Sequence, residues 1–303
     1  MEKFKLFFGY FIICTVWGST WLAMKFSLEH YPPFFATSVR FFIATAALYA
    51  LIKLRGGKIK FEKENAHIFW KLTLFSYSLP FAMVFYAEQT VSSGLGAVLF
   101  ATFPFFVIIF SRMMLKQKTD FFQILGVTLG FTGIVLIFAQ DLTSQNFSAL
   151  TGILLILLSS AIQAYISVYL KKHGKNVSVL QMNFYPFLVS GVIVLIFSLL
   201  FETLPNDLLN PEGLAAITYL AVFGSVLTFS TYYWLMKRMN VVILSLSSFI
   251  TPIIAVYLGW LILNESFSEN VYLASALVLL GVLLANFKGL YKYIANLRLQ
   301  GEH

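Results

Sequence analysis

Charged residues are scarce in this chain of 303 residues. Lys, Arg, Asp and Glu together make up 11% of it, whereas soluble globular domains average about 25%. Hydrophobic residues reach 59% and aromatic residues 17%, and the mean hydropathy is +0.82. Because so few polar side chains cannot cover the surface of a folded chain, this composition excludes a water-soluble single-domain enzyme.

Residues that build disulfides, metal centres and nucleotide sites are also few. The single cysteine, Cys14, excludes an intramolecular disulfide and a cysteine-based metal cluster. No GxxxxGKS motif is present, so we do not expect this chain to be driven directly by ATP. The histidines all lie between or beyond the apolar runs, without the spacing of a zinc site: His30, His67, His173 and His303. No metal or cofactor is expected.

Long apolar runs dominate the sequence. A helix needs about 20 apolar residues to cross a bilayer, at ~1.5 Å per residue. Ten such runs cover residues 6–24, 33–52, 68–88, 93–113, 121–139, 149–169, 180–200, 212–234, 241–262 and 271–289. The first run is longer than a signal-peptide core and lacks a clear cleavage site, so we expect a retained helix. The connections are too short for a soluble domain. The sequence therefore predicts an all-α membrane protein with ten transmembrane helices.

The basic residues indicate the orientation of these helices. If the N-terminus is cytoplasmic, only Lys25 and Arg40 of the 21 Lys and Arg residues lie away from the cytoplasmic side, which leaves 21 − 2 = 19 on it. Lys and Arg accumulate in cytoplasmic loops, so we predict that both termini are cytoplasmic. The same asymmetry explains the net charge of +8 without a nucleic-acid partner.

An internal repeat is predicted from matched helix-breaking residues. Pro104 and Pro252 are separated by 252 − 104 = 148 residues, and the same offset relates Gly133 to Gly281. Each half holds five runs, an odd number, so the second half must enter the membrane in the opposite orientation. We expect one five-helix repeat over 1–140, a second over 149–289 and a cytoplasmic tail over 290–303. Inverted repeats of this kind recur in secondary transporters, whose substrate site lies where the repeats meet.

Short motifs in order along the chain resemble those of an EamA-type domain of the drug/metabolite transporter superfamily, especially its metabolite-exporter branch. They are Trp17-Gly18-Ser19-Thr20, Pro32-Pro33, Arg40-Phe41, Ala87-Glu88-Gln89, Ser92-Ser93-Gly94, Ala101-Thr102-Phe103-Pro104, Thr251-Pro252 and Asn264-Glu265. The second half departs from the pattern, because Ser160-Ala161-Ile162-Gln163 replaces the Trp-Gly motif. The resemblance implies a multi-pass transporter of the cell membrane, which here would be a bacterial inner membrane. It also implies that the cargo is an exported amino acid, aromatic compound or drug-like amphiphile.

The resemblance also implies that the first helix of each repeat lines a central cavity. The candidate lining residues combine aromatic rings with hydroxyl groups and one amide, which suits an amphipathic metabolite. They are Trp17, Thr20, Trp21, Tyr86, Gln163, Tyr165, Tyr233 and Trp234. For Trp17 and Trp21, four residues apart on one helix face, packing or membrane anchoring is the alternative interpretation.

Two charged residues fall within or beside the second and third runs. Arg40 lies about seven residues into its run, roughly 10 Å from the outer surface, where a charge costs a few kcal/mol. It either binds an anionic group of the substrate or is structural, bonded to helix-end carbonyls. Glu88 is either an interfacial acid near a helix end, or a gate or protonatable site for an exported cation. We predict that Arg40 and Glu88 form a partly buried pair in the outer leaflet.

Proline and glycine residues suggest where helices bend and pack. Pro104 and Pro252 are expected to kink their helices, either for packing alone or as gating hinges. Gly126, Gly130 and Gly133 form a face of small residues that permits close helix approach.

Other functions fit the sequence less well. A channel would need a selectivity filter or charged ring, and neither is visible. A membrane enzyme would need a nucleophile with its base, or clustered aspartates, whereas the aspartates are scattered over loops and no histidine lies within a run. A lipid-linked flippase remains an alternative. Proton exchange and the substrate gradient alone both remain open as energy sources, and the oligomeric state is not predicted.

Overall fold

A computed structural model describes residues 2–57, 59, 61–143, 146–174, 177–239, 244, 247–289 and 291. The α-helices are α1 (Glu2–His30), α2 (Pro33–Leu54), α3 (Ala66–Leu72), α4 (Leu79–Ala87), α5 (Ser93–Phe100), α6 (Phe103–Leu115), α7 (Phe121–Thr143), α8 (Phe147–His173), α9 (Gln181–Phe201), α10 (Pro211–Ala221), α11 (Thr228–Met236), α13 (Ser247–Leu263) and α14 (Glu269–Ala285). A short 3-10 helix spans Lys63–Asn65. The described residues contain no strand.

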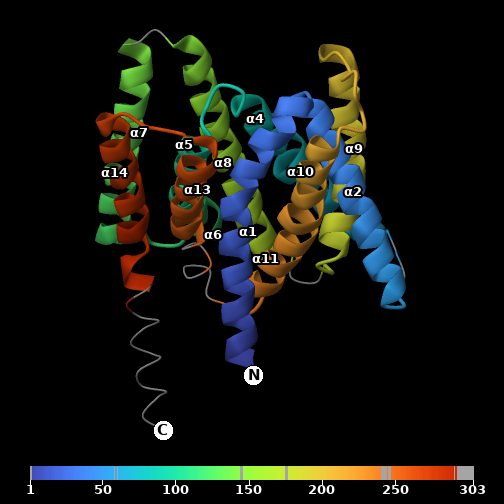
Figure 1. The fold of residues 1–303 in the computed structure, drawn as a ribbon. Helices are drawn as coiled ribbons and strands as arrows, with labels where there is room; N and C mark the ends of the chain where they lie inside the picture. Colours follow the sequence, from blue (N-terminus) through green and yellow to red (C-terminus); the bar gives the residue numbers. More distant parts are fainter. Residues whose placement is uncertain are drawn as a thin grey trace.

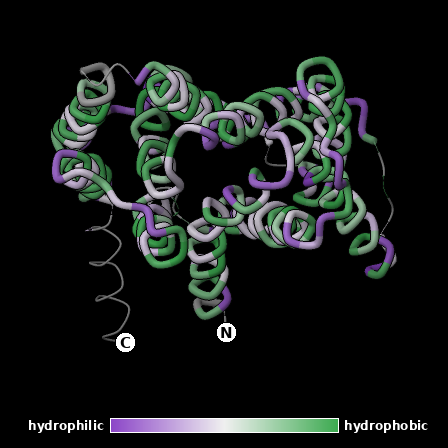
Figure 2. Tube along the Cα trace, turned by 45° about the horizontal axis from the view of Figure 1, so that its top comes forward, coloured by the Kyte–Doolittle hydropathy of each residue, from purple (hydrophilic) through white to green (hydrophobic). Residues whose placement is uncertain are grey.

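Most of these helices are long and apolar enough to cross a membrane. In the described part of the chain, eight continuous helical stretches meet that length and composition, and α13 and α14 are two shorter apolar helices. Hydrophobic residues dominate the helices, whereas hydrophilic residues gather at the connections between them (Figure 2). The prediction of an all-α membrane protein is confirmed. The predicted tail, 290–303, lies outside the described residues apart from Tyr291.

Two of the predicted helices contain a π-helical turn that the sequence did not indicate. Thr73–Ser78 joins α3 to α4, and Val222–Leu227 joins α10 to α11. A π turn adds about one residue to a helical turn and so rotates the residues that follow by roughly 100°. These two turns therefore change which side chains face the centre of the molecule.

The two matched prolines differ in their local structure. Pro104 lies in the first turn of α6, after a break at Ala101 and Thr102, where the missing N–H costs no helical hydrogen bond. Pro104 still lies well inside the stretch Ser93–Leu115, and the break directly before it interrupts that stretch. Pro252 does lie inside a helix, α13, as expected.

Helices from the two halves of the chain interleave. α1 packs against α10, α11 and α13, whereas α8 packs against α4, α5 and α6. α1 runs through the middle of the molecule beside α13 and α11 (Figure 1). Each half therefore supplies a long helix to the packing of the other half.

α7 and α14 form a closely packed pair at one edge of the molecule (Figure 1). A Cβ atom built on Gly281 would lie 2.6 Å from the carbonyl oxygen of Gly126, and one on Gly133 would lie 2.5 Å from that of Ala274. Only glycine permits this approach of two backbones. The predicted small-residue face is used for helix packing, and it includes Gly130, whose Cβ would meet the ring of Phe105.

Candidate functional site

A cavity of about 140 Å³ lies where α1, α2, α4, α5, α8, α11 and α13 meet. Five of the predicted residues line it: Trp17, Thr20, Trp21, Gln163 and Tyr233. The face of α1 that carries Thr20 and Trp21 also carries Met24, which lines the cavity one turn further along. Residues three and four apart share a helix face, so one side of α1 provides much of the cavity wall.

Aromatic rings from several helices line the cavity. Trp17 packs against Phe229 at 5.6 Å between ring centroids and against Tyr232 at 5.3 Å. Trp21 lies 6.0 Å from the ring of Phe100 on α5. These distances are those of favourable aromatic pairs, so the rings hold one another in place around the space.

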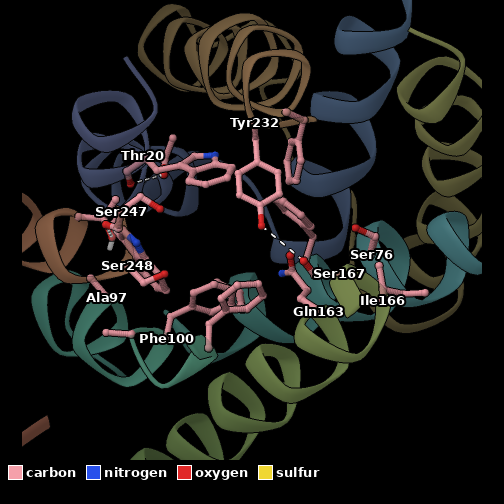
Figure 3. A pocket seen from close by; sticks show the side chains of 18 of the residues that line it. Thr20, Ser76, Ala97, Phe100, Gln163, Ile166, Ser167, Tyr232, Ser247 and Ser248 are labelled. Atoms are coloured by element: carbon pink, nitrogen blue, oxygen red, sulfur yellow. Dashed lines mark hydrogen bonds between the residues drawn. The ribbon is translucent and has the colours of Figure 1, made fainter. Parts of the chain in front are cut away.

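Polar groups interrupt this aromatic lining. The hydroxyl of Tyr232 and Oγ of Ser167 are 3.4 Å apart, and Gln163 lies beside Ser167 at the cavity (Figure 3). On α13, Ser247 and Ser248 present hydroxyl groups from the facing side (Figure 3). The arrangement can receive a molecule that has an apolar body and a few hydrogen-bonding groups.

Three predicted lining residues lie elsewhere. Tyr86 is 48% exposed and stacks on Phe34 at 6.1 Å. Trp234 packs beneath the guanidinium of Arg238 at 4.7 Å, and Tyr165 packs against Phe110 at 5.7 Å.

Helix phase explains two of these misses. Tyr86 is two residues beyond Val84, and Trp234 is one beyond Tyr233, and both Val84 and Tyr233 line the cavity. A rotation of about 100° per residue turns Tyr86 and Trp234 away from the space.

Several lining residues were not predicted from the sequence. They are Met24, Ser76, Phe81, Val84, Ala97, Phe100, Ala101, Phe103, Ile166, Ser167, Leu170, Phe229, Tyr232, Leu244, Ser247, Ser248 and Thr251. Arg40, for which a contact to the substrate was one of two interpretations, also lines the cavity. The spacing of Ser247, Ser248 and Thr251 on one face of α13 was the available signal for three of them.

Arg40 is held by the π turn of the second half. The residue is 2% exposed. Its Nε donates to Oγ of Ser225 at 2.9 Å, and its Nη2 donates to the carbonyl oxygen of Gly224 at 3.3 Å. The guanidinium carbon lies 4.6 Å from the ring centroid of Phe81, a cation–π distance.

The predicted Arg40–Glu88 pair is not formed. In the part of the chain that the structure describes, the ion pairs within 4.0 Å join other residues, and Arg40 bonds to the π turn instead. The π turn leaves a carbonyl and a hydroxyl within reach of the guanidinium, which the sequence pattern could not indicate.

Glu88 is fully buried within the protein, at the end of α4. It lies directly after α4 with 0% exposure, and within the described residues neither carboxylate oxygen has a hydrogen-bond partner. The ammonium group of Lys25 donates to the backbone carbonyls of Glu88 and Val91, at 2.6 Å for Val91. A fully buried carboxyl group without a hydrogen-bond partner is costly to ionise.

Glu265 caps the start of a helix in the other half of the chain. Its Oε1 accepts from the backbone N–H of Ser93 at 2.7 Å, and its Oε2 accepts from the N–H of Gly94 and from Oγ of Ser93, each at 3.0 Å. The carboxylate thus satisfies unpaired N–H groups at the positive end of α5. Among the described residues, no group of three His, Cys, Asp or Glu side chains could hold a metal ion.

Comparison with known proteins places this arrangement in a transporter family. The model of the EamA-like transporter family matches residues 5–139 and again residues 150–287. The uncharacterized inner membrane transporter YedA of Escherichia coli (strain K12) is 30% identical over 301 residues, 97% of this chain and 94% of its own length. Protein PagO of Salmonella typhimurium is 30% identical over 284 residues, 94% of this chain and 93% of its own.

A solved crystal structure supports the fold alone. It superposes with a TM-score of 0.69 at 20% identity, over 92% of this chain and 96% of its own. The family and the name of YedA indicate a transporter rather than an enzyme. The chain therefore belongs to the EamA-like transporter family and is a multi-pass transporter of the cell membrane.

Proposed function

We propose that this chain is a secondary transporter that exports small organic metabolites by alternating access. The observation that carries the proposal is the central cavity, which both halves of the chain line with aromatic rings, hydroxyl groups, an amide and a guanidinium. Such a lining suits an amphipathic molecule. Amino acids, aromatic compounds and drug-like amphiphiles are the substrate classes that the family resemblance suggests.

We further propose ten membrane-crossing helices arranged as two inverted repeats, 1–140 and 149–289, with both termini cytoplasmic. Lys116 after α6 and Asn264 after α13 both have a left-handed φ of 53°, and their separation, 264 − 116 = 148, equals that of the matched prolines. The π turns occupy corresponding places in the two halves. The two separate matches of the family model also support this division.

Contacts at the far end of α1 are candidates for an outer gate. Lys25 lies near that end and binds the backbone carbonyls of Glu88 and Val91, and Glu265 binds the start of α5. In an outward-open state these contacts would separate. Pro252 is the candidate hinge, because it directly follows the cavity-lining face of α13.

Counterflow in proteoliposomes tests the transport proposal. Vesicles loaded with unlabelled substrate should take up labelled substrate transiently above its equilibrium level, with saturation and trans-stimulation. Linear, non-saturating flux would instead indicate a channel. Movement of a lipid-linked probe between leaflets, without counterflow of small molecules, would favour a flippase.

We propose Glu88 as the site of proton coupling. A carboxyl group that is fully buried, without a hydrogen-bond partner among the described residues, is expected to exchange a proton when its surroundings open to water. In Glu88→Gln, a pH gradient should no longer accelerate export, while substrate counterflow continues. Export by Glu88→Gln that still responds to the gradient as the parent protein does would refute this role.

A further inference from the structure

The described lining of the cavity carries a positive charge and no negative one. Arg40 is the only charged side chain among the described residues that line it, and no Asp or Glu is included. Arg40 is nearly fully buried, and within the described chain no carboxylate lies within ion-pair distance of it. The buried carboxyl of Glu88 acts on Arg40 without forming an ion pair with it. A buried charge without a directly bonded counter-ion is costly, so a ligand that carries a negative charge would be favoured at this position.

The guanidinium has donors left for such a ligand. An arginine carries five N–H donors. One bond to Ser225 and one to Gly224 use two of them, and 5 − 2 = 3 remain without an acceptor among the described residues. Those bonds involve Nε and Nη2, so both hydrogens of Nη1 and the second hydrogen of Nη2 remain. Nη1 and Nη2 together form a fork that matches the two oxygens of a carboxylate.

The surroundings of Arg40 are suited to the rest of an organic acid. Phe81 lies beneath the guanidinium and also lines the cavity. Thr20 is adjacent, because a Cβ atom built on Gly224 would lie 2.7 Å from the methyl group of Thr20 and 3.3 Å from Nη2 of Arg40. The aromatic wall around Trp17 follows on the same helix. An apolar or aromatic body can therefore extend from a carboxylate at Arg40 into the cavity.

The described lining offers an ammonium group aromatic faces but no negative charge. Its described polar residues other than Arg40 are hydroxyl-bearing side chains and the amide of Gln163, which can accept a hydrogen bond but supply no negative charge. An amine would also be repelled by Arg40. A zwitterion would be attracted to Arg40 through its carboxylate and repelled by Arg40 through its ammonium group.

We propose that the cavity selects organic monocarboxylates with an aromatic or bulky apolar body, bound through Arg40, over zwitterions and amines. This inference deepens the proposed export function and rests on it. The competing explanation is that Arg40 only clamps the π turn. In that case its replacement would weaken the binding of all ligands alike.

Three probes with the same phenylethyl body separate these explanations. They are 3-phenylpropionate, phenylalanine and phenethylamine, which carry a carboxylate, both charges and an ammonium group. Binding is measured by quenching of tryptophan fluorescence in the purified transporter. We expect 3-phenylpropionate to bind about tenfold or more tightly than phenethylamine, with phenylalanine between them. In Arg40→Gln, the affinity for 3-phenylpropionate should fall at least about tenfold while that for phenethylamine does not fall.

Two further variants keep the test decisive if Arg40→Gln does not fold. Arg40→Lys retains the charge but not the fork, so it should weaken carboxylate binding yet preserve the order of the three probes. Ser225→Ala removes the clamp bond and keeps the charge, so it should lower melting temperature more than it changes this order. Equal weakening of all three probes, equal affinity of the parent protein for acid and amine, or no binding of any probe would overturn the inference.

Counterflow with the same probes separates this inference from the transport proposal. Saturable counterflow of phenethylamine but not of 3-phenylpropionate would leave the transporter proposal intact and overturn the carboxylate preference. Selective binding of 3-phenylpropionate without any trans-stimulation would support the preference and contradict secondary transport.

Discussion

Removing the Glu265 carboxylate should uncouple α5 from the segment that follows α13. Three bonds at 2.7, 3.0 and 3.0 Å join it to Ser93 and Gly94. Hydrogen bonds to an ionised group contribute about 1.5–3 kcal/mol each when well formed. Because the Glu265 side chain is only half-buried, bonds to water replace part of the stabilisation that these three bonds provide. We therefore expect Glu265→Ala to lower the free energy of unfolding by about 2 kcal/mol in total.

A melting experiment in detergent measures this effect. On the scale of roughly 2–4 °C per kcal/mol for large domains, Glu265→Ala should lower the melting temperature by about 4–8 °C. Glu265→Gln should lower it by about half as much, since one amide oxygen can still accept. The matched control is Glu269→Gln, which changes an exposed acid nearby in the chain and should melt like the parent protein.

Gly259 offers an independent way to disturb the same cap. A Cβ atom at this position would collide with the Glu265 carboxylate and lie 2.9 Å from Oγ of Ser93. Gly259→Ala should therefore reproduce much of the loss seen in Glu265→Ala, and the double variant should lose less than the sum of the two. Full additivity, or unchanged melting of Glu265→Ala, would refute the capping role.

Three further predictions concern helix packing, a buried carboxyl and a buried hydroxyl. Gly281→Val should lower the free energy of unfolding by about 1–3 kcal/mol, because its side chain would push α14 away from α7. The control, Leu273→Val on the exposed face of α14, should change stability little. Equal melting temperatures of the two variants would contradict the close packing of α7 and α14. Because the Glu88 carboxyl is fully buried without a hydrogen-bond partner among the described residues, its ionisation is costly in the folded state, and the folded state loses stability as rising pH favours the ionised form. The melting temperature of Glu88→Gln should therefore exceed the parent's by more at pH 8 than at pH 5, and parallel curves would exclude the effect. Tyr77→Phe removes a hydroxyl that donates to Oδ1 of Asn183 at 2.8 Å in a fully buried site, so it should cost about 1–3 kcal/mol; the control, Tyr49→Phe, changes an exposed ring and should leave the melting temperature unchanged.

The sequence predicted the helices well because their apolar length and spacing are local properties. It also placed Trp17, Thr20 and Trp21 on one face of α1, and that face lines the cavity. This success follows from the regularity of α1, which has no break between Glu2 and His30. Spacing along an unbroken helix determines which residues share a face.

Most of the site predictions that failed concern residues that lie beyond a π turn or bond to one. Tyr86 and Trp234 both lie beyond a π turn, which shifts helix phase by about 100°, so the pattern could not show which neighbour faces the cavity. Arg40 was expected at its observed depth, but its partners belong to one of those turns. Glu88 is buried where Lys25, 63 residues earlier in the chain, bonds to its backbone carbonyl, a long-range contact that no local pattern reveals.

Opposite orientation of the two halves is the claim on which the transport account rests, and chemical labelling of whole cells tests it most directly. Single cysteines are introduced as Lys116→Cys and Asn264→Cys in a background that carries Cys14→Ser. Both positions are exposed and are related by the repeat offset. A membrane-impermeant maleimide should label the Asn264→Cys protein in intact cells and the Lys116→Cys protein only after permeabilisation. Labelling of both in intact cells, or of neither, would place the two positions on the same side and contradict the inverted repeat.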